Sequence, residues 1–268
     1  VFMAMPIVAP AVGQVLLLTG PWQTIFVFMG GLALAIAVWA YMRLPETLAE
    51  EKRRALSISA VAEGFRLVFT NRVALLYGLS GMFLFGAMFG FISASQQIFV
   101  DIYGLGPWFP AAFALMASTM AVAQFVNARI VRHFGQRRLS HFALLVYLAV
   151  SVIWLVLALL GPIPLPLFFA IFLTIQVGFG WQASNMNSLS MEPLGAVAGT
   201  AASVFGFLQT VGGALLGTFI GQQFDGTLVP NAVGYVAMGV LILSCVLVAE
   251  KGRLFGVGQD YEAPQSGH

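Results

Sequence analysis

The side chains that could contact a ligand are neutral amides and hydroxyls, and they lie within long apolar runs. A neutral polar group in such a run is costly unless it bonds to a neighbour or faces a cavity. For each of them singly, hydrogen bonding between helices is the alternative to contact with a ligand. The candidates are Ser93, Ser95, Gln96, Gln97, Gln124, Asn127, Gln176, Gln182, Asn185, Asn187 and Gln209.

The run over residues 165–188 carries polar residues on two helix faces. One face holds Gln176, Gly180, Ala183 and Asn187, at spacings of 4, 3 and 4. Gln182 and Asn185 share another face, and both faces cannot line one cavity. Gln176 lies nearer the middle of the run, so we expect its face to meet a substrate. Neighbouring Phe side chains suit an adaptable apolar pocket, although lipid contact or packing is the alternative for each. Phe85 is one such aromatic neighbour. The predicted cavity residues are Phe89, Ser93, Gln96, Gln176, Phe179, Gly180, Phe205 and Gln209.

No acidic residue lies within these runs. The acidic residues lie in loops, at run ends or in the tail, at positions 46, 50, 51, 63, 101, 192, 225, 250, 260 and 262. The single Cys245 allows no intrachain disulfide, and His133, His141 and His268 have no metal-ligand spacing. We therefore predict no metal, no cofactor and no membrane-embedded enzyme. Glu192 is expected to be a surface charge.

The composition requires a lipid environment for the elements that carry these residues. Of 268 residues, 60% are hydrophobic and 8% are charged, whereas soluble domains are about 45–50% apolar and about 25% charged. The apolar runs are about 20 residues long, which is the length of a membrane-spanning helix. An all-α integral membrane protein is therefore predicted. Its eight spans are residues 2–19, 22–42, 73–99, 108–130, 140–160, 165–188, 198–221 and 232–249.

The basic residues fall in three groups along the chain, separated by two and by four predicted spans. Because both counts are even, all 12 Lys and Arg residues lie on one side of the membrane, which the positive-inside rule makes the cytoplasm. Both ends of the chain are then cytoplasmic. The net charge of +2 favours no nucleic acid or other acidic polymer as a partner.

The longest connector divides the chain into four parts. Residues 1–43 form two spans, 44–72 a cytoplasmic linker, 73–249 a six-span bundle, and 250–268 a polar tail expected to be disordered. Ile58, Val61, Phe65 and Val68 recur at helical spacing, which indicates a linker helix at the inner membrane surface, with a solvated helix as the alternative. The chain opens at Val1 within an apolar run, so we interpret it as a fragment lacking four spans of a 6+6 transporter.

Two patterns predict special helix geometry. Pro6 and Pro10 remove backbone donors and kink the first span, while Ala9 and Gly13 allow close approach of another helix. A second pattern places Gly206, Thr210, Gly213, Gly217 and Gly221 at spacings of 4, 3, 4 and 4. These residues predict one smooth helix face for close packing, either static or as a sliding contact between two transporter halves.

The chain resembles the Bcr/CflA family of multidrug efflux proteins, within the major facilitator superfamily. The similar segments are Ala9–Gly13, Trp22, Phe26, Leu44–Thr47, Ile92–Ser95, Tyr103–Leu105 and Gly199–Ser203. The family usually has a second glycine where this chain has Gln14. The superfamily's cytoplasmic loop motif is degenerate: Gly135 and Arg137 match it, whereas Ala128 and Arg132 replace its first Gly and its Asp. That loop is expected to be a positively charged anchor rather than a conformational latch.

The resemblance implies twelve helices and proton-driven export of small amphipathic drugs from a bacterium across its inner membrane, by a protein expected to be monomeric. The proton gradient would supply the energy. The proton-coupling group is expected in the missing N-terminal helices, which would complete the protein as partners of this chain. The alternatives are an uptake carrier for a sugar or another metabolite, and a truncated remnant that does not transport.

Overall fold

A computed structural model describes residues 12–13, 15–44 and 58–256 of the chain. It divides into two units, Val1–Ala60 and Val61–His268. The described parts of both units consist of helices and short connections, without a strand. The predicted all-α fold is therefore confirmed. The proposed arrangement of domains remains a prediction.

The first unit contains one complete described helix, α2 (Gln23–Arg43), which matches the predicted span at 22–42. Its apolar side chains point in all directions, as expected of a membrane-spanning helix. Residues 12–13 and 15–19 are also helical. A methyl group added to Gly13 would meet no atom within 4 Å. The kink residues Pro6, Ala9 and Pro10 lie outside the described residues.

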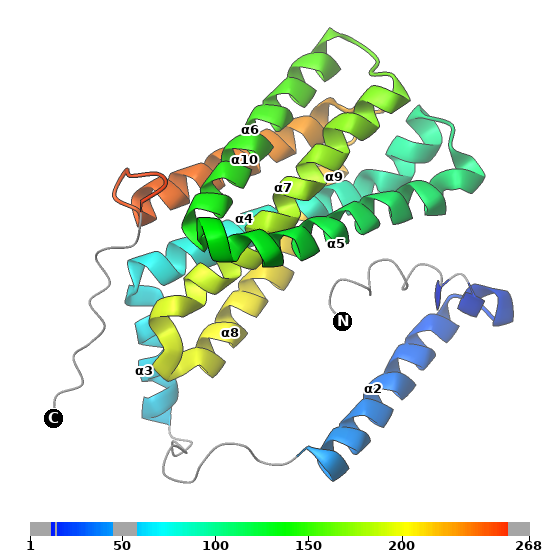
Figure 1. Cartoon of the computed structure of the whole chain (residues 1–268). Coiled ribbons are helices and arrows are strands. Elements are labelled where there is room, and N and C mark those ends of the chain that lie inside the picture. The colour runs from blue at the N-terminus through cyan, green and yellow to red at the C-terminus, as the bar shows by residue number, and fades with distance from the viewer. Residues whose placement is uncertain (1–11, 14, 45–57, 257–268) are drawn as a thin grey trace, which may run out of the picture. The chain divides into compact units, whose positions relative to one another are not determined.

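The second unit is a helical bundle whose helices begin and end within a few residues of the predicted spans (Figure 1). Its longer helices are α3 (Ile58–Thr70), α4 (Arg72–Gln96), α5 (Phe109–Phe134), α6 (Gln136–Leu160), α7 (Leu165–Met191), α8 (Ala198–Phe207), α9 (Gly213–Gln222) and α10 (Val229–Ala249). Shorter helical turns are η2 (Gln97–Ile102), η3 (Gly106–Trp108), η4 (Glu192–Val197) and η5 (Leu208–Gly212).

Six helical stretches of the described residues are long and apolar enough to cross a membrane. One of them, Leu165–Gln222, contains two predicted spans, α7 and the continuous α8–η5–α9. The chain reverses between them at η4, where Leu194 has the non-helical torsions φ −115° and ψ 23°. The predicted span at 2–19 lies mostly outside the described residues, so its full length is not observed.

Helix α4 occupies the centre of the bundle, where it packs against α7, α9 and α10. Its ring contacts with α7 pair Phe85 with Phe179 and Phe91 with Phe172, so the two helices are antiparallel. Phe172 also contacts Trp154 of α6 and belongs to a buried apolar cluster that joins α4, α6, α7 and α10. Aromatic packing of this kind stabilises the bundle interior.

Glycines bring α9 unusually close to α4. A methyl group added to Gly217 would overlap Cβ of Phe89 and would lie 2.7 Å from the backbone N of Gly90. Gly213 and Gly221 contact α4 in the same way, one turn earlier and one turn later. Because α4 belongs to the same unit, these contacts support static packing within the bundle rather than a sliding contact between halves.

The predicted smooth glycine face is interrupted by the π-turn η5. Gly206, which precedes it, is exposed and would meet no atom within 4 Å if it carried a side chain. A π-turn adds one residue to a helical turn and so rotates the preceding residues about the helix axis. Gly206 and Thr210 are both exposed, whereas Gly213 and Gly217 are buried against α4. The prediction that all five positions share one face was wrong.

The linker helix α3 has one face against the bundle and one exposed apolar face. Gly64 lies against Thr200 of α8, and Val68 is fully buried in a cluster with residues of η4 and α8. Phe65 and Phe69 stack on each other at 6.4 Å and remain exposed, as does Val61. The predicted helix is therefore present, although Val68 serves packing rather than an outer surface. The side chain of Ile58 lies outside the described set.

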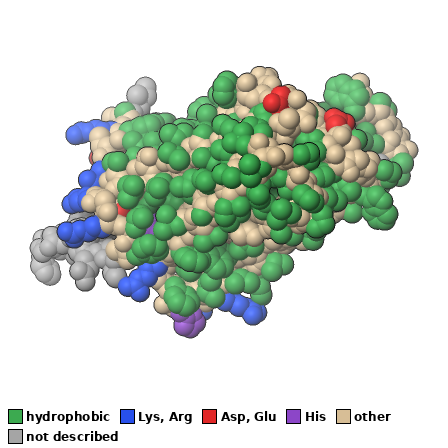
Figure 2. Space-filling view, turned by 90° about the horizontal axis from the view of Figure 1, so that it is seen from above, with side chains coloured by type: hydrophobic (Ala, Val, Ile, Leu, Met, Phe, Trp, Pro, Cys, Tyr) green, Lys and Arg blue, Asp and Glu red, His purple; other side chains and the backbone are tan. Residues whose placement is uncertain are grey.

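The two ends of the bundle differ in charge. Figure 2 shows Lys and Arg side chains gathered toward one end, whereas the other end carries acidic side chains without Lys or Arg in this view. Arg72 begins α4, while Asp101 lies beyond its far end. Asp225 follows α9, which runs parallel to α4 and so ends on the same side as Asp101. The observed distribution agrees with the charge segregation predicted from the sequence.

Candidate functional site

Four residues of α4 form a line of aromatic and then polar side chains. Phe85, Phe89, Ser93 and Gln96 follow at helical spacings of 4, 4 and 3 and lie on one face. Phe179 of α7 extends the line, because its ring centroid is 5.7 Å from that of Phe85. The rings of Phe85 and Phe89 are 6.2 Å apart. We call these five residues the aromatic–polar strip.

The strip is partly open to its surroundings. Phe85 and Phe89 are half-buried, Ser93 and Gln96 are exposed, and Phe179 is buried at one end. The close approach of α9 fixes the position of the strip residues relative to that helix. Glycines of α9 lie directly against the Cβ atoms of Phe85, Phe89 and Ser93. Such a surface offers ring contacts beside neutral hydrogen-bonding groups, which suits an amphipathic ligand without a fixed charge.

Four other predicted cavity residues do not reach this strip. Phe205 is 1% exposed, and its ring lies on Gly78 in the packed core. Gln176 is 8% exposed. Gly180 faces α5, where an added methyl group would lie 3.1 Å from the carbonyl oxygen of Met120. Gln209, half-buried in η5, lies over Gly81 of α4. Their part in a cavity remains a prediction.

The second polar face of α7 is used in helix packing. Asn127 of α5 and Asn185 of α7 are buried and exchange two side-chain hydrogen bonds, at 3.2 and 3.0 Å. The indole N–H of Trp181 donates to the carbonyl oxygen of Ala123 at 2.9 Å. These contacts satisfy the polar groups and join α5 to α7, which is the interhelical alternative considered for such residues.

The degenerate loop motif lies where α5 ends and α6 begins. Gly135 has φ +81°, a conformation that favours glycine, and it connects the two helices directly. Arg132 is exposed. Arg137 donates from Nε to Oε1 of Glu250 at 3.1 Å and from a terminal nitrogen to Oε2 of Glu192 at 3.2 Å.

The expected unpaired anchor is therefore part of an ion-paired network. The motif's own acid is replaced, but carboxylates from the ends of α7 and α10 approach Arg137 instead. Glu192, expected as a surface charge, stays partly exposed and is also paired. The pairing of Glu250 with Arg137 could not be predicted from the sequence, because the two residues are separated by 113 positions. A hydrogen bond from Tyr77 to Glu250 extends the network to α4.

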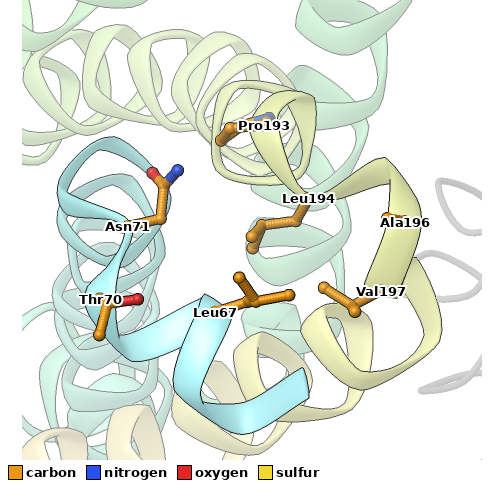
Figure 3. Close-up of a pocket in the computed structure, with 7 residues that line it drawn as sticks. All are labelled: Leu67, Thr70, Asn71, Pro193, Leu194, Ala196 and Val197. Atoms are coloured by element: carbon orange, nitrogen blue, oxygen red, sulfur yellow. The ribbon is translucent and has the colours of Figure 1, made fainter. Parts of the chain in front are cut away.

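A pocket of about 330 Å³ lies near the end of the bundle that carries Arg72 (Figure 3). It is formed between the junction of α3 with α4 and the η4 turn, apart from the aromatic–polar strip. Its lining is mainly apolar, with Thr70 and Asn71 as polar members. The other lining residues are Leu67, Pro193, Leu194, Ala196 and Val197. No sequence pattern indicated this pocket, because it joins segments more than 120 positions apart along the chain.

Comparison with known proteins identifies a matching family. The family model described as "Major Facilitator Superfamily" matches residues 1–218. The Bicyclomycin resistance protein homolog of Haemophilus influenzae is 29% identical over 251 residues, which cover 92% of this chain and 61% of that protein. The Multidrug resistance protein MdtL of Klebsiella pneumoniae is 27% identical, covering 78% of this chain and 52% of that protein.

A further relative is the uncharacterized MFS-type transporter YdgK of Bacillus subtilis. It is 26% identical over 223 residues, which cover 81% of this chain and 54% of that protein. The chain thus spans between 52% and 61% of the length of these three relatives.

Proposed function

This chain belongs to the major facilitator superfamily, and from this premise we propose that the whole protein exports drug-like small molecules by proton-coupled alternating access. The names of two relatives, which refer to bicyclomycin resistance and to multidrug resistance, support export of drugs. The chain is a multi-pass membrane protein by its family and its helices. We place it in a bacterial inner membrane, as a monomer, with the Arg-rich end of the bundle in the cytoplasm.

The observation that carries this proposal is the aromatic–polar strip. Its rings provide apolar contact area, and Ser93 and Gln96 provide neutral donors and acceptors beside them. A surface without a charged side chain in the strip can accept chemically different amphipathic molecules, because ring contacts need little directional matching. In the whole protein this strip would form one wall of the transport pathway.

The proposal is tested by a drug-susceptibility panel in a bacterial host that lacks its own efflux pumps. The full-length coding sequence should raise resistance to several amphipathic drugs. Cells that carry it should also accumulate less drug than cells without it, and a proton uncoupler should abolish this difference. Phe89→Ala should change the resistance profile several-fold for some drugs. Phe142→Ala is the matched control, since this Phe is exposed on α6, away from α4.

The amount of each variant in the membrane must be measured alongside resistance. Unchanged resistance for Phe89→Ala at equal protein level would contradict a role of the strip in substrate contact. Resistance that survives the uncoupler would contradict proton coupling while leaving export itself supported. Uptake of a sugar or another metabolite without any drug resistance would favour the uptake carrier.

A further inference from the structure

A buried histidine at the Arg-rich end of the bundle is bonded at both ring nitrogens. His141 of α6 is 0% exposed. Its Nδ1 accepts the backbone N–H of Phe255 at 2.9 Å, and its Nε2 lies 3.0 Å from the hydroxyl oxygen of Tyr77. The Tyr77 hydroxyl in turn donates to Oε1 of Glu250 at 2.7 Å. Helices α4 and α6 and the segment after α10 therefore meet at one imidazole, and Tyr77 links it to Glu250 at the end of α10.

These contacts agree with only one protonation state of the ring. The Phe255 N–H points at Nδ1, so Nδ1 must carry a lone pair. The Tyr77 proton is used toward Glu250, so Nε2 must donate its own proton to the Tyr77 oxygen. His141 is then neutral, with its proton on Nε2. A second proton on Nδ1 would face the Phe255 N–H, donor against donor, and that hydrogen bond would be lost.

Charged side chains near His141 belong to α6, to the ends of α7 and α10, to α4 and to the segment after α10. Arg137, one turn earlier on α6, opposes a positive imidazole, while Glu250 favours it through the intervening Tyr77. Arg137 is itself shared between Glu250 and Glu192. The remaining charged groups of these elements are Arg72 of α4, Arg138 of α6, and Lys251 and Arg253 after α10.

The segment at residues 251–256 is bonded to the end of α10 through its first three residues, whereas its last part is held by Leu254 and Phe255. Lys251 and Phe255 have φ values of +52° and +64°, which are unfavourable for residues other than glycine. The Phe255 ring lies edge-on to His141 at 5.9 Å, and Leu254 packs against the apolar core. Because the segment's backbone is strained, losing the bond to His141 should shift its equilibrium toward release.

We propose that His141 is a proton-binding site whose occupancy controls the segment at 251–256. The neutral imidazole holds the segment on the bundle, and a proton taken from the cytoplasm onto Nδ1 releases it. The bond that breaks is the hydrogen bond from the Phe255 N–H, and no covalent bond changes. The site would make the exposure of this end of α10 and α6 depend on cytoplasmic pH.

Thiol labelling of the full-length protein tests this inference. In a background with Cys245→Ala and no other cysteine, Leu254→Cys places a thiol in the segment's packed position, and Arg253→Cys provides an exposed reference. The ratio of maleimide labelling at 254 to that at 253 should rise several-fold as the pH is lowered from about 8 to about 5, because a proton on Nδ1 removes the acceptor of the Phe255 N–H. Ordinary thiol reactivity also falls in that direction, so labelling at each position is divided by its labelling in the denatured protein at the same pH.

Two further variants separate the proton site from general loosening. His141→Gln keeps a neutral hydrogen-bond acceptor and donor but cannot take up a proton. The ratio of labelling at 254 to that at 253 should therefore stay low at every pH in this variant. Phe255→Pro cannot adopt the φ of +64° found at this position, so it displaces the segment and serves as the released reference, with a high labelling ratio at every pH. A flat ratio in the parent protein would overturn the proposal, and so would an equal rise in His141→Gln. If His141→Gln does not fold, His141→Asn takes its place as the variant without a titratable ring, and its labelling ratio should likewise not change with pH.

Discussion

At the scale of single residues, the glycines of α9 are effective because of what lies opposite them. Gly217 meets a backbone nitrogen and a Cβ atom of α4, and neither can move without displacing the helix. Gly206, which spacing alone had placed on the same face, has no atom opposite it within 4 Å. The presence of a glycine therefore does not by itself indicate close helix packing. Its role depends on whether atoms of a neighbouring helix lie within contact distance.

Gly217→Ala should destabilise the protein, and Gly206→Ala should not. The new methyl group at 217 would lie 2.7 Å from the backbone N of Gly90, and overpacking of this kind costs about 1–3 kcal/mol or more. At 206 the methyl group is free, and alanine gains about 0.5–1 kcal/mol in a helix. Thermal unfolding in detergent measures both variants. Equal melting temperatures for the two would show that α4 and α9 do not touch as described.

The reciprocal amide pair between Asn127 and Asn185 predicts strong coupling between two single substitutions. Each Asn→Ala change leaves the partner amide buried without its bonds, which costs about 1–3 kcal/mol. The double variant removes both polar groups, so its loss of stability should be smaller than the sum by about 0.5–2 kcal/mol. A double-mutant cycle on thermal unfolding measures this difference, and strictly additive losses would contradict the pairing.

At the scale of elements, apolar run length and turn residues were sufficient to place the described helices. Each predicted span from 22–42 onward coincides with a helix to within a few residues, because a lipid-spanning helix needs a fixed number of apolar residues. The π-turns η2 and η5 were not predictable, since their residues have the same types as those of ordinary turns. The wrong assignment of Gly206 follows from this one extra residue.

The interfacial position of α3 is an element-scale prediction that the exposed Phe65 makes testable. A nitroxide on Phe65→Cys should be more accessible to oxygen than to a water-soluble nickel reagent, because oxygen concentrates in lipid. Glu63→Cys, exposed on the same helix, is the control and should show the reverse preference. Preference for nickel at both positions would mean that α3 is a solvated linker helix, the alternative considered from its sequence.

At the scale of the whole molecule, sequence predicted the aromatic–polar strip better than the network at the Arg-rich end. Phe89, Ser93 and Gln96 belong to one helix, so their shared face follows from spacing alone. The contact of Phe179 with Phe85 could not be derived, because it depends on how α7 packs against α4. Arg137, Glu192 and Glu250 come from distant parts of the chain, and only the fold brings them together.

We predict the orientation of the bundle in the membrane from its charge distribution, and this prediction can be tested directly. Helix α5 has 26 residues and is therefore about 39 Å long at about 1.5 Å per residue, which exceeds the roughly 30 Å apolar core of a bilayer. Residues near its C-terminal end, such as Arg132, must then lie on the opposite side from Asp225. The positive-inside rule assigns the Arg-rich side to the cytoplasm.

In intact cells, a membrane-impermeant maleimide should label Asp225→Cys, and it should label Arg132→Cys only after the membrane is opened. Both positions are exposed in the bundle, so a difference in labelling reports the side of the membrane rather than burial. Cys245 is replaced in both variants to remove its own signal. Labelling of Arg132→Cys in intact cells, with Asp225→Cys protected, would reverse the orientation. It would also expose the His141 site to the outside of the cell, and the proton proposed to release residues 251–256 would then come from the external medium.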